Sequence, residues 1–160
     1  MNILQEGKKA PAFKGFNQDE EVISSADFKG RWFVLYFYPQ DDTPTCTVQA
    51  CNMRDNFGAL KSKGIEVIGI SPDEVKKHKK FGQKYSLPFN LLADPEHKII
   101  DKFGVWGEKQ LYGRKYMGLH RTSFLIDAKG IIRKVFAKPK SKQHAEDIVT
   151  AWNELENKTT

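Results

Sequence analysis

The sequence has few cysteines, only Cys46 and Cys51 in 160 residues. Two thiols are too few for the disulfide framework of a small secreted protein. Four residues separate them, so the Cys-x-x-Cys spacing of a redox-active dithiol is absent as well. No histidine stands at a metal-ligand spacing from either thiol, so we predict no metal site. We expect surface or structural roles for all four histidines, which are His78, His97, His120 and His144.

Long apolar runs and low-complexity segments are also absent. No apolar run approaches the roughly 20 residues that a membrane-spanning helix needs. Residues 1–6 lack the basic and apolar parts of a secretory signal. We therefore expect no membrane partner and a cytoplasmic location. With 39% hydrophobic residues, the chain has enough apolar material for one packed domain over residues 1–160.

The charge is basic but modest, with a net value of +6. The run Lys76-Lys77-His78-Lys79-Lys80 can bind phosphates, although a solvated helix face is the simpler interpretation. A nucleic-acid-binding module is a possible alternative, and salt-dependent binding would favour it. No nucleic-acid motif is present, so we expect no nucleic-acid partner.

Apolar patterning predicts an α/β fold. Residues 32–38 form a continuous aromatic and β-branched run ended by Pro39, and residues 65–70 form a second apolar run, as in strands buried on both faces. Further strands are expected at residues 91–93, 120–126 and 131–136, with an N-terminal hairpin around residues 12–23 and a loop over 104–118. Helices are expected over 44–63, 71–85, from Asp94 and from Ser141. This order fits a thioredoxin-like fold, in which a central mixed sheet is flanked by helices and extended by the N-terminal hairpin.

The segment between Pro39 and Cys51 carries both thiols. Thr43 is a good helix N-cap and Pro44 a good first helical residue, which places Cys46 in the first turn. The helix dipole and free N–H groups stabilise an anion there, so we expect this thiol to ionise more readily than a free cysteine. Cys46 also begins an apolar stripe that continues through Ala50, Met53, Phe57 and Leu60.

Cys51 points away from this stripe, by about 140° around the helix. On a regular helix the two Cα atoms lie roughly 8–9 Å apart, whereas a disulfide needs Cα atoms within about 7 Å. Any bond between Cys46 and Cys51 therefore requires the first helical turns to unwind.

Three motifs resemble the peroxiredoxin family. Pro39-x-x-x-Thr43-x-x-Cys46 matches its active-site motif. The wider match is similar to the Q-type subgroup, the bacterioferritin comigratory proteins, and it is carried by Thr43-Pro44-x-Cys46-Thr47-x-x-Ala50-Cys51, Phe103-Gly104-Val105-Trp106-Gly107-Glu108-Lys109 and His120-Arg121-Thr122-Ser123-Phe124-Leu125-Ile126-Asp127. One departure is Thr45, where glycine is common, and we expect it to alter fit rather than chemistry.

The resemblance implies a thiol peroxidase that needs no cofactor. Cys46 would attack a hydroperoxide and become a sulfenic acid, and Cys51 would condense with it to a disulfide that thioredoxin or a similar dithiol reduces. Thr43 would hydrogen-bond the peroxide or thiolate, Pro39 would shield the sulfur from water, and Arg121 would polarise the peroxide. We expect a monomer or a weak dimer.

Simpler roles compete with these assignments. Without the resemblance, Cys46 reads equally well as a packing residue, and Arg121 reads better as a surface residue. Cys51 as a packing residue and Thr43 as a helix cap only are further alternatives. A dithiol-disulfide oxidoreductase acting on protein disulfides is the main rival function, and an insulin-reduction assay separates it from a peroxidase.

Overall fold

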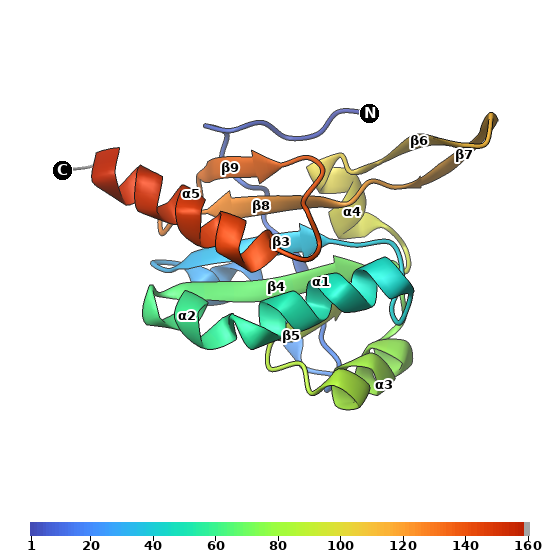
Figure 1. Ribbon diagram of the computed structural model, residues 1–160, viewed down its shortest axis with the longest axis horizontal. Coiled ribbons are helices and arrows are strands. Elements are labelled where there is room, and N and C mark those ends of the chain that lie inside the picture. The colour runs from blue at the N-terminus through green and yellow to red at the C-terminus, as the bar shows by residue number, and fades with distance from the viewer. Residues whose placement is uncertain (159–160) are drawn as a thin grey trace.

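A computed structural model of the chain describes residues 1–158, and its centre is a mixed β-sheet (Figure 1). Within these residues the sheet has five strands in the order β5-β4-β3-β8-β9. Their bounds are Asn90–Ala93 (β5), Ile65–Ser71 (β4), Trp32–Phe37 (β3), Thr122–Ile126 (β8) and Ile132–Phe136 (β9). Strands β3, β4 and β5 run parallel, whereas β8 is antiparallel to both β3 and β9. The predicted α/β class with a mixed central sheet is confirmed.

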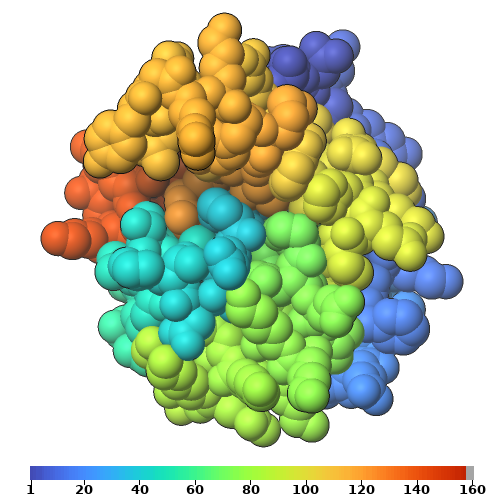
Figure 2. All heavy atoms as spheres, turned by 90° about the vertical axis from the view of Figure 1, so that its right-hand side faces the viewer, coloured from blue at the N-terminus to red at the C-terminus, as the bar shows by residue number. Residues whose placement is uncertain are grey.

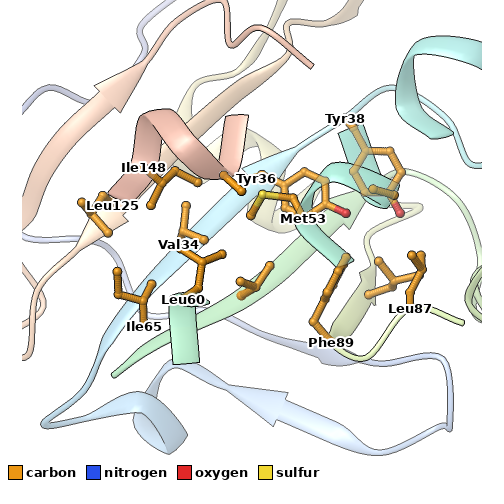
Figure 3. Close-up of a cluster of buried hydrophobic side chains, with 14 of the residues drawn as sticks. Val34, Tyr36, Tyr38, Met53, Leu60, Ile65, Leu87, Phe89, Leu125 and Ile148 are labelled. Carbon is orange, nitrogen blue, oxygen red and sulfur yellow. The ribbon is translucent and has the colours of Figure 1, made fainter. Parts of the chain in front are cut away.

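Helices cover both faces of this sheet (Figure 1). Their bounds are Pro44–Asp55 (α1), Phe57–Ser62 (α2), Val75–Tyr85 (α3), Lys98–Phe103 (α4) and His144–Lys158 (α5), with a 3₁₀ turn at Ser25–Phe28 (η1). Because side chains alternate along a strand, β3 sends Val34 and Tyr36 into the core beneath α1, α2 and α5, shown in Figure 3. It sends Leu35 and Phe37 into a second core beneath α4 and η1. The continuous apolar run in β3 is thus explained by burial on both faces.

Two predicted helices differ from the structure, one by an interruption and one by its first residue. The helix expected over 44–63 is interrupted at Asn56, whose side-chain amide donates to the carbonyl of Asn52 and so competes with the helical backbone bonds. The helix expected from Ser71 begins only at Val75. Ser71 ends β4 instead, where its hydroxyl donates to the Asp73 carboxylate and accepts from the Asp73 N–H in a local turn.

The loop predicted over 104–118 was wrong. It forms a hairpin of β6 (Trp106–Leu111) and β7 (Arg114–Leu119), which projects from the body of the fold (Figure 1). Tyr112 and Gly113 connect the strands with φ angles of 51° and 76°, as in a tight hairpin turn. Most of its residues are exposed, so the alternating apolar pattern of a half-buried strand is missing.

Other local predictions are confirmed. The N-terminal hairpin pairs β1 (Lys14–Phe16) with β2 (Val22–Ser24), and the turn at residues 127–130 joins β8 to β9. The helix expected from Asp94 begins only at Lys98, with His97 at its N-cap position, although the Asp94 carboxylate accepts from the backbone N–H groups of Ile99 and Ile100. Among residues 1–158, no helix combines the length and apolar character that crossing a membrane requires.

Candidate active site

The segment that carries the thiols begins where β3 leaves the sheet. Thr43 takes the N-cap position of α1 with extended backbone angles, and Pro44 is the first helical residue. The Thr47 N–H donates to the Thr43 carbonyl at 2.9 Å, so Cys46 lies in the first turn as predicted. The predicted capping bond was wrong, because the Thr43 hydroxyl donates to the Gln40 carbonyl at 2.9 Å instead.

Cys46 and Arg121 are brought together from distant parts of the chain. The Cys46 side chain is buried, with only 2% of the residue exposed. Arg121 lies between β7 and β8, and its Nη2 donates to Cys46 Sγ at 3.2 Å. A guanidinium bonded to a sulfur at a helix N-terminus favours the thiolate, which is the nucleophilic form of cysteine.

Gln49 completes this contact and was missed by the sequence analysis. It is fully buried one turn after Cys46, and its Oε1 accepts from Arg121 Nη1 at 2.6 Å. Arg121 therefore grips two residues of α1 at once. The signal that could have identified Gln49 is its position three residues after Cys46, on a helix face that is otherwise apolar.

Cys51 occupies a different environment. It is partly exposed, and neither thiol forms a disulfide within the described part of the chain. Helix α1 is continuous from Cys46 to Cys51, so the two thiols are held apart by the geometry described above. Pro39 and Thr43 both lie half-buried on the turn that leads into α1. Thr45 is exposed beside this turn.

The phenol of Tyr36 lies close to the thiols, beneath α1. A Cβ atom at Gly69, its partner on β4, would lie 2.9 Å from Tyr36 Cζ, so only glycine leaves room for the ring. Burial raises the pKa of Tyr36 well above its ordinary value, and the nearby charges of Asp41 and Cys46 raise it further. Tyr36 therefore remains a neutral phenol. Its hydroxyl has no hydrogen-bond partner among residues 1–158.

A buried histidine supports the site from α5. His144 Nε2 lies 2.7 Å from Ser123 Oγ on β8, two residues beyond Arg121. Burial lowers the pKa of His144 to about 4, with Arg121 adding to the effect and Asp147 opposing it. The imidazole is thus neutral at ordinary pH.

The surface near the thiols is hollowed. Figure 2 shows a recess between the β6–β7 hairpin, in orange, and the segment around residues 40–50, in cyan. Beside the start of α1 lies an open groove of about 510 Å³, lined by Pro44, Thr45, Val48 and residues 140–143. Small molecules therefore have an approach to the helix start.

Comparison with known proteins identifies the family of the chain. Residues 6–135 match the AhpC/TSA family. The chain is 47% identical to peroxiredoxin Bcp of Escherichia coli over 152 residues, which cover 95% of this chain and 97% of the relative. It is 40% identical to peroxiredoxin Bcp of Bacillus subtilis over 155 residues, which cover 97% and 99%.

Solved structures show the same fold. The bacterioferritin comigratory protein of Xanthomonas campestris, described for its alkyl peroxide reduction activity, matches with a TM-score of 0.83 at 27% identity, over 89% of this chain and 90% of that one. Peroxidoxin BcpB of Mycobacterium tuberculosis matches with a TM-score of 0.84 at 27% identity, over 94% and 97%. The chain therefore belongs to the AhpC/TSA family and, within it, to the peroxiredoxins of the Bcp or Q type, which are thiol-dependent peroxidases.

Proposed function

We propose that Cys46 is the peroxidatic residue of this peroxidase and that it reduces hydrogen peroxide and organic hydroperoxides. The observation that carries the proposal is the hydrogen bond from Arg121 to the buried Cys46 sulfur at the start of α1. The Xanthomonas campestris relative acts on alkyl peroxides, which supports the organic part of the substrate range.

The first step is a nucleophilic displacement. The Cys46 thiolate attacks one peroxide oxygen, an S–O bond forms and the O–O bond breaks. The products are Cys46 sulfenic acid and an alkoxide or hydroxide, which takes up a proton to become an alcohol or water. Arg121 and the N–H groups of the first helical turn stabilise the negative charge that moves from sulfur to oxygen. The Thr43 hydroxyl, which donates to the Gln40 carbonyl in the chain without substrate, turns its proton to the peroxide, and Pro39 keeps bulk water from the sulfur.

Cys51 then resolves the sulfenic acid. Its thiol condenses with Cys46 sulfenic acid, so an S–S bond forms and water leaves. Because α1 is intact in the reduced chain, its first turns must unwind for this step. The nearby thiol protects Cys46 from further oxidation to sulfinic and sulfonic acid.

A dithiol reductant closes the cycle. Thioredoxin or a similar protein donates two electrons and two protons to the Cys46–Cys51 disulfide: its own dithiol becomes a disulfide, and both thiols of this chain are restored. The proposal includes a monomeric or weakly dimeric chain working in the cytoplasm, where free thiols persist.

Peroxide consumption in a thioredoxin-coupled assay tests the assignment of Cys46. We expect wild type to turn over and Cys46→Ser to lose turnover completely. Cys51→Ser is the matched control, because it should still consume one equivalent of peroxide before stopping. Undiminished turnover by Cys46→Ser would overturn the proposal.

Mass spectrometry tests the role of Cys51. After one equivalent of peroxide, wild type should lose two protons and yield a peptide that crosslinks Cys46 and Cys51. A stable sulfenic acid on Cys46 of the wild-type chain would assign resolution to another thiol.

A further inference from the structure

The turn between β3 and α1 is fastened to the body of the protein by a buried carboxylate. Asp41 lies in this turn, midway between Pro39 and Thr43, and its side chain is fully buried. Its Oδ1 accepts from the Tyr38 hydroxyl at 2.6 Å, and its Oδ2 lies 2.6 Å from His78 Nδ1. An unpaired buried carboxylate is costly, so these contacts fix the turn firmly.

His78 carries the attachment across to the sheet. The residue is fully buried on α3, and its Nε2 lies 3.0 Å from the Leu92 carbonyl on β5. A carbonyl oxygen can only accept, so Nε2 holds a proton and donates it. With Nδ1 bonded to Asp41, both ends of the ring are held, and the ring links the turn to α3 and to the sheet at once.

The backbone of the turn is held as well. The Asp41 N–H donates to Asp73 Oδ2 at 2.7 Å, and the Ser71 hydroxyl donates to the same oxygen. Asp41, Asp73 and His78 place three potential metal-ligand atoms within 4.8 Å of one another. A bound ion would keep its ligands about 2 Å away on different sides, and the 2.6 Å contact between His78 and Asp41 leaves no space for it. We interpret the cluster as a hydrogen-bonded clamp.

A second attachment of the same turn is exposed. Asp42 adopts a left-handed backbone with φ of 60°, and its carboxylate accepts from Lys84 Nζ at 2.9 Å and from the Tyr85 hydroxyl at 3.0 Å. An exposed ion pair contributes little to the position of a turn, because water competes for both charges. The two attachments thus differ in burial while serving the same short segment.

We propose that His78 is a positioning residue: through the buried bond to Asp41 it holds the turn carrying Pro39 and Thr43 in the place where peroxide meets Cys46. The inference rests on the proposed role of Cys46. Asp41 is two residues from Pro39 and two from Thr43, so a shift of Asp41 displaces both. Arg121 reaches the sulfur from the segment between β7 and β8, which lies outside this turn.

This division of labour gives a specific signature. The charge on sulfur is set by Arg121 and the helix start, whereas the placement of the peroxide is set by the turn. Loss of the clamp should therefore slow the reaction with peroxide but leave the general nucleophilicity of the thiolate in place. A small misplacement of reacting groups can lower a rate by about 100-fold.

The test compares two reactions of one thiol, in a Cys51→Ser background so that Cys46 alone reacts. The second-order rates of Cys46 oxidation by hydrogen peroxide and of its alkylation by iodoacetamide are measured by quenching and mass spectrometry. For His78→Gln we expect the oxidation rate to fall by about 10- to 100-fold and the alkylation rate to stay within about 3-fold. Lys84→Ala, which removes only the exposed attachment, should leave both rates within about 2-fold.

An equal fall in both rates, or an unchanged oxidation rate, would overturn the role of His78. If His78→Gln does not fold, Asp41→Asn carries the same test, because it keeps the size of the side chain and removes the carboxylate that His78 holds. Its ratio of oxidation to alkylation should fall by about 3-fold or more, and an unchanged ratio overturns the inference. Turnover that survives Cys46→Ser overturns the proposed function instead, so the two failures are distinguishable.

Discussion

Helix α1 is held on two sides, and the two attachments differ in chemistry. Before Cys46, the buried carboxylate of Asp41 is bonded to His78 of α3. After Cys51, the side-chain amide of Asn52 bridges to the start of α5: its Nδ2 donates to the Lys142 carbonyl at 3.1 Å, and its Oδ1 accepts from the Ala145 N–H at 2.8 Å. The first attachment is fully buried, whereas the second also includes the Glu146 carboxylate, which accepts from Asn52 Nδ2 at 2.9 Å, and is partly exposed.

This difference indicates where the helix can open. Residues 43–51 lie between the attachments and include both cysteines, and within this stretch Arg121 bonds to Cys46 and Gln49. Unwinding confined to these residues breaks few side-chain bonds, so local opening is cheap relative to global unfolding. The two attachments then keep the ends of the opened segment in place. Cys46 and Cys51 therefore sample few conformations before they meet in the proposed disulfide.

The two buried histidines also differ in their hydrogen-bond partners. His78 faces a carboxylate and a carbonyl, whereas His144 faces the hydroxyl of Ser123, and its Nδ1 has no partner in the described chain. A buried histidine without an anionic partner resists protonation. The α5 side of the site should therefore be sensitive to acid through His144.

The largest effect is expected from Arg121, which faces the stretch between the attachments. Arg121→Gln removes the charge that faces Cys46, and we expect the rate of Cys46 oxidation by peroxide to fall by about 100- to 1000-fold. Stopped-flow mixing with hydrogen peroxide measures the rate. Arg133→Gln on β9, which removes an ion pair with Asp127, is the matched control and should react normally. A loss below about 10-fold for Arg121→Gln would contradict the central role of Arg121.

The second largest effect is expected at acid pH, where protonation of His144 on α5 lowers the free energy of unfolding. The folded chain protonates His144 only near pH 4, while the unfolded chain does so near 6.5. Between these values the unfolded chain holds more protons, so this contribution to stability is complete above pH 6.5 and is lost as the pH falls towards 4. At 1.36 kcal/mol per pH unit, the loss amounts to roughly 3 kcal/mol.

Urea unfolding at a series of pH values measures this slope. His144→Gln should be less sensitive than wild type between pH 6.5 and about 4. Identical pH dependence in the two proteins would show that His144 does not couple the fold to protons.

The amide bridge after Cys51 should matter less. Asn52→Ala removes the bonds to Lys142, Ala145 and Glu146, and we expect the free energy of unfolding to fall by about 2 kcal/mol. Disulfide formation should change little, because Asn52 lies outside the opening segment. Asn153→Ala, at an exposed position of α5, provides the control for urea unfolding. A loss equal to that of the control would show that Asn52 does not hold α1 to the start of α5.

The smallest effect is expected at the exposed attachment of the turn. Lys84→Ala should leave the melting temperature within about 2 °C of wild type, because the ion pair with Asp42 is solvated. Calorimetry at low and high salt checks this. A shift in melting temperature larger than that of Asn52→Ala would show that the Lys84–Asp42 ion pair contributes more to stability than the bonds of Asn52.

The parts of the fold that sequence could predict are those determined by neighbouring residues. Continuous apolar runs such as residues 32–38 predict buried strands. The Thr43-Pro44 pair predicts the first residue of α1 correctly. The position of Cys46 in the first turn followed from that pair. The β6–β7 hairpin was missed because exposed strands leave no apolar alternation, although the hairpin turn at Tyr112-Gly113 was readable in principle.

The site depends on contacts between distant residues, and those were less accessible. Arg121 was selected only through the family resemblance, since nothing local connects it with Cys46, 75 positions away. His78 was expected to be a surface or structural residue within a basic run. The structure makes it structural, because α3 buries His78 together with Phe81 while the lysines beside it face outward. Neither a contact at 37 positions, to Asp41, nor its burial can be inferred from the run itself.

The projecting hairpin offers a practical consequence for following the enzyme at work. Its tip residue Tyr112 is 99% exposed, and its second strand ends two residues before Arg121. A fluorophore attached at position 112 would extend into solvent without disturbing either core. It would nevertheless stand at the turn that opens the strand leading to Arg121, so its signal would report the arrival of a partner in real time.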